Sequence, residues 1–123
     1  DFDGWWEQNS LWYTNQDITR EDFEDYSFLN GLNKGDIVIV SDRRAPEDGD
    51  IIIFGANYTY PLIHRIIGFD PLSTKGDHNS GQLEQELEIP EEAVLGHSVA
   101  RIPVVGWLMV IFFDGFKSGF VFA

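Results

Sequence analysis

After Gly35 the apolar residues of this chain come in short runs, each closed by turn residues, and this spacing restricts the fold more than any other feature. The runs are rich in isoleucine and valine, which favour strands, and each is too short for an ordinary helix. We expect strands at residues 36–41, 50–54, 62–67, 96–102 and 107–113, and one helical turn at 90–94, opened by a proline. Many short strands at close spacing predict a mainly β, barrel-like domain.

The first 34 residues differ from the rest because they are acidic and rich in tryptophan. Their aromatic residues recur at spacings of three and four, which is typical of a partly amphipathic helix. Thr19 precedes two acidic residues, so a second helix is expected to begin there with a hydroxyl cap, with Phe23 and Tyr26 facing the same side. We therefore expect a helical, acidic insertion or appendage over 1–34 and a β-rich core over 35–123, within one structural domain.

Charge and composition exclude several classes of function. The chain has 21 acidic and 8 basic residues and a net charge of −13, so it offers no basic stripe for nucleic acid, and we expect no nucleic-acid partner. It has no cysteine, which excludes disulfides and thiol chemistry. No apolar run reaches the ~18 to 20 residues that a membrane-spanning helix needs.

His64 is the first candidate for chemistry. It lies within the apolar run PLIHRII at 61–67, where a histidine is commonly a packed structural residue. The loop KGDHN at 75–79 places Asp77 on a turn, where a carboxylate can reach an imidazole and fix its tautomer. An imidazole held in this way can accept the proton of a serine hydroxyl. His78 and His97 lack the spacing of metal ligands and are expected to be surface residues.

Four blocks together resemble the type I signal peptidases, in their archaeal and endoplasmic-reticulum branch. They read NKGDIVIV at 33–40, GDIIIF at 49–54, PLIHRII at 61–67 and TKGDHNSGQ at 74–82. A fifth, VLGHSVARIPVVGWL at 94–108, is similar to the C-terminal strands of archaeal members. The blocks occur in the family's order. The resemblance implies a signal-peptidase or LexA-like, β-barrel-like fold that carries the tryptophan-rich segment as a helical insertion.

The resemblance also implies catalytic roles. His64 stands where the bacterial branch has its lysine, which makes it the general base of a serine peptidase, and Asp77 matches a family acid that would orient the ring. Three alternatives are open for the nucleophile: a serine preceding Asp1, Ser27 without the family's usual Met and Pro neighbours, or loss of the nucleophile. Neither a metal nor an organic cofactor is implied.

The implied function is removal of signal peptides from secretory preproteins at the extracytoplasmic face of the cell membrane. Extended signal peptides would add along a strand edge, and an anchor preceding Asp1 would tie the domain to the lipid bilayer. The N-terminal tryptophans either pack the inserted helix or lie at the membrane interface. The alternative is a catalytically silent, signal-peptidase-like binding or assembly module, whose copies could self-associate through the apolar tail at 112–123. A LexA-like self-cleaving relative is disfavoured because that group uses lysine as its base.

Overall fold

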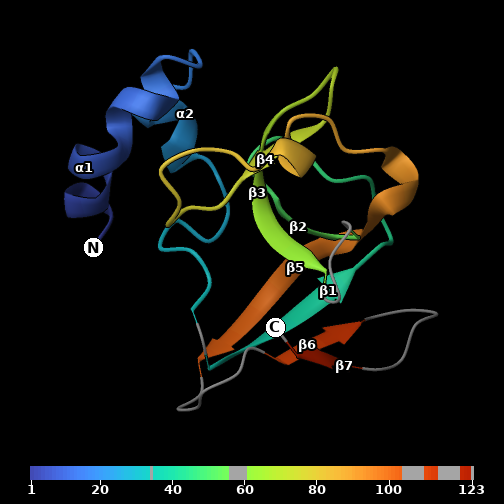
Figure 1. The fold of residues 1–123 in the computed structure, drawn as a ribbon. Helices are drawn as coiled ribbons and strands as arrows, with labels where there is room; N and C mark the ends of the chain where they lie inside the picture. Colours follow the sequence, from blue (N-terminus) through green and yellow to red (C-terminus); the bar gives the residue numbers. More distant parts are fainter. Residues whose placement is uncertain (34, 56–60, 104–109, 114–119, 123) are drawn as a thin grey trace.

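The computed structural model describes residues 1–33, 35–55, 61–103, 110–113 and 120–122, the last two ranges as backbone only. The described chain is mainly β, as the short apolar runs predict. Seven strands form one sheet in the order β4-β3-β2-β5-β1-β6-β7 (Figure 1). They are β1 Asp36–Ser41, β2 Ile51–Phe54, β3 Leu62–Gly68, β4 Ser73–Lys75, β5 Val94–Pro103, β6 Val110–Phe113 and β7 Phe120–Phe122.

The sheet has an antiparallel body with a smaller extension at one edge. Strands β4, β3, β2, β5 and β1 pair antiparallel in that order, β6 pairs parallel with β1, and β7 pairs antiparallel with β6. Within the described strands no pairing joins β4 to β7, so this sheet is open and the expected barrel-like closure is not seen. All four residues of the central strand β2 are buried, because packed side chains cover both faces of the sheet there.

Two short helices precede the sheet and lie at its β3–β4 end, away from β6 and β7 (Figure 1). Helix α1 spans Phe2–Thr14 and α2 spans Arg20–Glu24. The expected cap at Thr19 is confirmed: its side chain accepts a hydrogen bond from the Asp22 amide, and the Asp22 carboxylate accepts one from the Thr19 amide. The expected contact of Phe23 with Tyr26 is also present, with ring centroids 5.0 Å apart.

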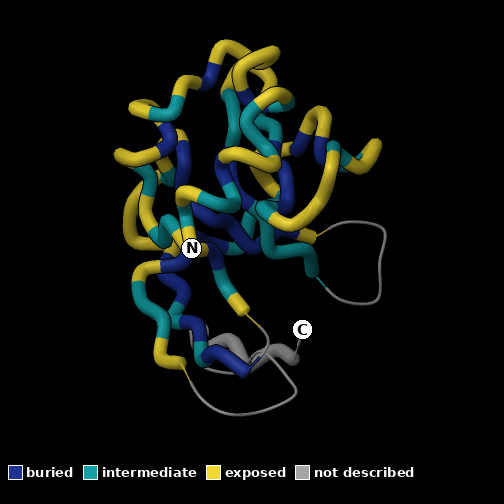
Figure 2. Tube along the Cα trace, turned by 90° about the vertical axis from the view of Figure 1, so that its left-hand side faces the viewer, coloured by how far each residue is buried: buried dark blue, intermediate teal, exposed yellow. Residues whose placement is uncertain are grey.

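Buried side chains form one cluster in the helices and one on each face of the sheet. Most of the exposed residues lie in the helices and in the segments between the strands (Figure 2). The helical cluster contains Trp6, Tyr13, Ile18 and Phe23. Of the tryptophans described, Trp6 is buried and Trp5 and Trp12 pack against this cluster, as expected for packing residues. The cluster around Val38, Val40 and Ile53 lies on one face of the sheet, and that around Ile52, Phe54, Ile66 and Ile89 on the other.

Several local expectations differ from the structure. Strand β4 is not among the strands expected from the sequence, and the helical turn after Pro90 is a single 3₁₀ turn, η2, at Glu91–Ala93. His97 was expected at the surface, but it is 1% exposed because β5 lies inside the sheet, between β2 and β1. Residues 107–109 of the last expected strand and much of the apolar tail lie outside the described residues. No helix in the described ranges is long and apolar enough to cross a membrane.

Candidate functional site

Strand β3 places His64 and Arg65 on opposite faces of the sheet. Side chains alternate along a strand, so consecutive residues point in opposite directions. The register sets His64 directly opposite Ile52 of β2 and Arg65 directly opposite Ile51. On the other side of β3, Lys75 of β4 lies opposite Arg65. These two neighbouring polar residues therefore have different hydrogen-bond partners, although both line one pocket.

A buried carboxylate holds one nitrogen of the His64 ring. Nδ1 of His64 lies 2.5 Å from Oε2 of Glu86, whose side chain is fully buried. Oε2 also accepts a hydrogen bond from the Thr74 hydroxyl at 2.8 Å, and Oε1 accepts one from the Leu83 amide at 3.0 Å. Burial raises the pKa of Glu86, but hydrogen bonds from His64, Leu83 and Thr74 outweigh burial and set that pKa below its usual value. Ionised Glu86 can only accept, so Nδ1 of His64 is the donor.

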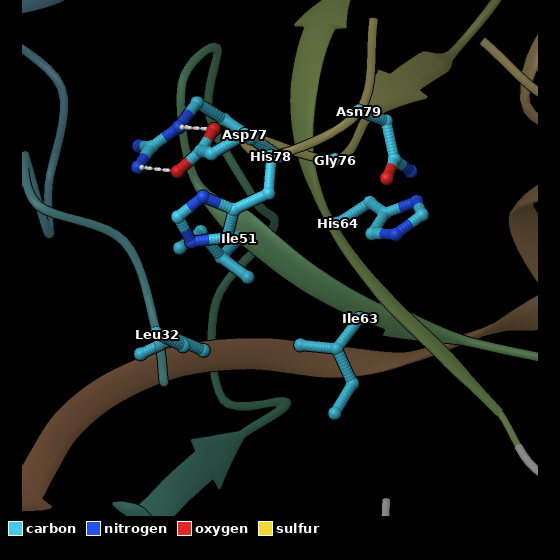
Figure 3. Close-up of a pocket in the computed structure, with 9 residues that line it drawn as sticks. Leu32, Ile51, Ile63, His64, Gly76, Asp77, His78 and Asn79 are labelled. Carbon is cyan, nitrogen blue, oxygen red and sulfur yellow. Dashed lines mark hydrogen bonds and ion pairs between the residues drawn. The ribbon is translucent and has the colours of Figure 1, made fainter. Parts of the chain in front are cut away.

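The other nitrogen of the ring, Nε2, lies beside the loop at 76–79. His64 lines a small pocket there, of about 180 Å³, and its side chain keeps 17% of its surface exposed. A Cβ atom on Gly76 would lie 2.8 Å from Nε2 of His64 and 2.7 Å from Nδ2 of Asn79, so the loop can approach the ring this closely only with glycine at this position. Figure 3 shows the Asn79 amide beside the His64 ring, with Ile63 and Leu32 on the opposite side of the pocket.

Asp77 does not hold the His64 ring, contrary to the expectation. Its carboxylate accepts hydrogen bonds from Nε of Arg65 at 2.9 Å and from Nη2 at 2.8 Å (dashed lines in Figure 3). Strand β4 ends at Lys75, which pairs with Arg65, and the turn that follows brings the Asp77 carboxylate to the Arg65 guanidinium. Asp77 still lines the pocket, but as the partner of a buried arginine.

Arg65 joins this loop to the helical segment. Nη1 donates to the carbonyl of Ser27 at 2.6 Å and to that of Gly49 at 2.9 Å, and Nη2 donates to the carbonyl of Phe28 at 2.7 Å. With the two bonds to Asp77, all five N–H groups of the guanidinium are used. A second contact also joins the loop to the helical segment: the Trp5 indole donates a hydrogen bond to the Asp77 carbonyl at 2.8 Å.

Ser27, the candidate nucleophile within the chain, lies away from His64. Its carbonyl accepts from Arg65, which places it on the other face of the sheet, and its side chain is exposed. Among the residues that the structure describes, no serine or threonine lines the His64 pocket. The structure therefore brings His64 and Glu86 together, leaves Asp77 at the pocket edge, and does not bring Ser27 to the site.

A second hollow continues from the His64 pocket towards the start of α1. It has a volume of about 570 Å³, and Asp77 and His78 line both hollows. Its other walls include Asp1, Phe2 and Trp5. The hollow lined by Asp1 therefore adjoins the pocket lined by His64.

Sequence reasoning missed Glu86, and the sequence carries little to distinguish it. Glu86 ends a 3₁₀ turn, η1, at Glu84–Glu86, within an acidic stretch whose other glutamates would all be equally plausible acids. Its neighbours Glu84 and Glu88 are exposed, whereas Glu86 is buried under β4 beside Thr74. The one local signal is the capping pattern, in which the Glu86 side chain accepts from the Leu83 amide three residues earlier.

No protein-family model matches this chain, and no curated protein or solved structure matches it either. Among the described residues, no group of three or more histidine, aspartate or glutamate side chains is placed to hold a metal ion.

Proposed function

We propose that this chain is the peptidase body of a signal-peptidase-type serine endopeptidase, in which His64 is the general base and Glu86 orients it. The observation that carries the proposal is the pair itself: a carboxylate with no exposed surface, 2.5 Å from Nδ1 of a histidine whose ring lines a pocket. Serine peptidases use this arrangement because the carboxylate fixes the tautomer and stabilises the imidazolium that forms.

The chemistry assigned to the pair follows from its hydrogen bonds. With Nδ1 donating to Glu86, Nε2 has a free lone pair and can accept the proton of a serine hydroxyl as the oxygen attacks a peptide carbonyl. The imidazolium then gives this proton to the leaving amine, so His64 is restored when the acyl-enzyme has formed. The low pKa of Glu86 suits this role, because the carboxylate stays ionised and opposite the developing positive charge.

The proposal takes the nucleophile from the chain preceding Asp1 rather than from Ser27. Ser27 is not among the residues that line the His64 pocket; it is exposed, and its carbonyl accepts a hydrogen bond from Arg65. Asp1, in contrast, lines the hollow that continues from the His64 pocket. A segment preceding Asp1 would reach Nε2 of His64 by running along that hollow and into the adjoining pocket.

The substrate class in this proposal is the signal peptide of a secretory preprotein, and the fold is of the signal-peptidase type. The support from the structure is the size and lining of the pocket beside His64. A volume of about 180 Å³ with Leu32, Ile51 and Ile63 in its walls suits a small side chain next to the scissile bond. The bilayer anchor, the extracytoplasmic location and the barrel-like closure rest on the sequence motifs.

The test is cleavage of a signal-peptide-bearing preprotein in detergent, with mass analysis of the cut site, by a protein that carries its native upstream segment. We expect His64→Ala to abolish cleavage and Glu86→Gln to reduce kcat by roughly 10³-fold or more, since an amide cannot stabilise the imidazolium. Glu84→Gln, an exposed neighbour in η1, is the matched control and should cleave normally. Equal activity of Glu86→Gln and Glu84→Gln would remove Glu86 from the mechanism.

A catalytically silent binding or assembly module is the second candidate, and one observation favours it. None of the described residues lining the His64 pocket carries a hydroxyl group. If the upstream-extended protein binds a signal peptide but does not cut it, and His64→Ala leaves binding unchanged, the silent module is the better description. Loss of cleavage on Ser27→Ala would instead return the nucleophile to Ser27.

A further inference from the structure

A separate pocket lies on the other side of β2 from His64. It has a volume of about 470 Å³ and shares no residue with the His64 pocket. The loop after β1, the turn between β3 and β4, and the start of β5 form its walls. Phe69, Leu72 and Val94 give it an apolar side. This size and lining are typical of sites for small molecules.

One residue of this pocket has an unmet hydrogen-bonding capacity. His97 lines the pocket and is 1% exposed, yet neither Nδ1 nor Nε2 has a hydrogen-bond partner within the described protein. Buried polar groups in proteins are nearly always hydrogen-bonded, and an unpaired one costs free energy that an apolar side chain of the same shape would avoid. A polar group of a bound ligand would remove this cost.

The charges around His97 indicate the nature of that group. Arg44 also lines the pocket with its side chain 49% exposed, and its contacts to Ala45, Glu47 and Asp50 all involve Nη1. Burial lowers the pKa of His97, and the positive charge of Arg44 lowers it further. An anion placed between the two side chains would therefore be attracted by Arg44 and would favour the protonated form of His97. Asp42, Arg43 and Glu91 also line the pocket and are exposed, so attraction by the net charge of the pocket does not by itself select an anion.

We propose that this pocket binds a small apolar carboxylate, whose head group pairs with Arg44 and His97 and whose tail lies against Phe69, Leu72 and Val94. A planar carboxylate can accept from the guanidinium and from the imidazole at once. Both ring nitrogens are covered in this structure, so binding is accompanied by a small movement of the His97 or Arg44 side chain. The ligand source is either a free fatty acid or the C-terminus of an apolar peptide, which present the same chemistry.

The first experiment is calorimetric titration of the chain with octanoate, with octanol as the uncharged probe of equal tail length. We expect saturable octanoate binding with a Kd below about 1 mM, and octanol binding at least about tenfold weaker. His97→Phe and Arg44→Gln should each weaken octanoate binding at least about tenfold. Arg20→Gln, which changes an arginine of α2 outside this pocket, is the control and should bind as the wild type does.

Nuclear magnetic resonance of the His97 ring gives a second readout, in which octanoate should raise the pKa of this histidine. Arg44 is at the surface, so the Arg44→Gln variant keeps the test valid if His97→Phe does not fold. Binding of octanoate alone assigns a fatty acid, and equal binding of an acetylated Leu-Leu dipeptide, but not its amide, assigns a peptide C-terminus. Octanol binding as tightly as octanoate, unchanged binding by Arg44→Gln, or no saturation up to about 10 mM would each overturn the proposal.

Discussion

The replacement Arg65→Met tests whether the buried arginine is the main link between the helical segment and the sheet. The guanidinium has no exposed surface, and its partner Asp77 is 11% exposed. Methionine keeps much of the volume of the side chain but removes its charge and all five donors. Asp77 would then be a buried carboxylate without its cation, and the carbonyls of Ser27, Phe28 and Gly49 would lose a donor.

The expected loss is about 3 to 5 kcal/mol in the free energy of unfolding, because removing one partner leaves the other charge buried and unpaired. This loss is a large part of the total stability of a domain of this size. The Arg65 guanidinium also lies 5.0 Å from the centroid of the Phe23 ring, within the cluster that contains Trp6. Urea unfolding followed by tryptophan fluorescence therefore reports on the region that the replacement disturbs.

The control is Arg20→Met, which removes an arginine with two acidic partners of its own. Arg20 pairs with Asp3 and Glu24, but its side chain is 40% exposed. Exposed ion pairs contribute little to the free energy of unfolding because water solvates the separated charges, so the unfolding midpoint should stay near that of the wild type. The double variant Arg65→Met/Asp77→Leu should recover part of the loss, since the Asp77 carboxylate is no longer left without its arginine. The reasoning fails if Arg65→Met and Arg20→Met shift the midpoint equally, or if the double variant is the least stable of the set.

Three further predictions follow from single contacts. His97 has a lowered pKa in the folded state, so its contribution to stability is complete above the unfolded pKa of about 6.5 and is lost as the pH falls below that value. In urea unfolding, His97→Phe should therefore lose less stability than the wild type between pH 7 and pH 5. An equal loss in the two proteins would contradict this prediction. Gly76→Ala places a methyl group 2.8 Å from Nε2 of His64, so it should shift the ring resonances of His64, and an unchanged spectrum would show that the loop yields freely. Thr19→Ala removes the N-cap of α2 and should lower the free energy of unfolding by about 1 kcal/mol in thermal or urea unfolding. Thr14→Ala, at the last residue of α1, removes no N-cap and should lower it by less.

The strands that the sequence predicts well are those whose own residues favour them. The run at 36–41 is β1 residue for residue, because alternating isoleucine and valine favour an extended chain and bury one face whatever the rest of the fold does. Thr19 is predicted for the same reason, since a cap and its acidic partner lie three residues apart. Strand β4 is different: of its three residues only Thr74 favours strands, and the segment becomes a strand by pairing with β3.

The errors at the site have a common physical cause, which is that a face of a sheet is set by register and not by distance along the chain. Asp77 is nearer to His64 in sequence than Glu86 is, yet the turn after β4 brings its carboxylate to Arg65 and not to the His64 ring. Glu86 is brought to His64 by the turn that packs η1 against β4, a contact between segments that no local pattern encodes. His97 was misplaced in the same way, because its burial depends on two neighbouring strands.

The division of β3 into two faces also explains how the helical segment can affect a histidine that it does not contact. On one face, Arg65 donates hydrogen bonds to the carbonyls of Ser27 and Phe28 and to the carboxylate of Asp77. On the other, Gly76, the residue before Asp77, lies against the His64 ring. Since one peptide bond separates the two contacts, a shift of the helices moves Asp77 and with it the loop that bounds Nε2 of His64. Helices α1 and α2 are therefore part of the structure that positions the site, and a chain without them should lose the close approach of Gly76 even where the Glu86–His64 pair survives.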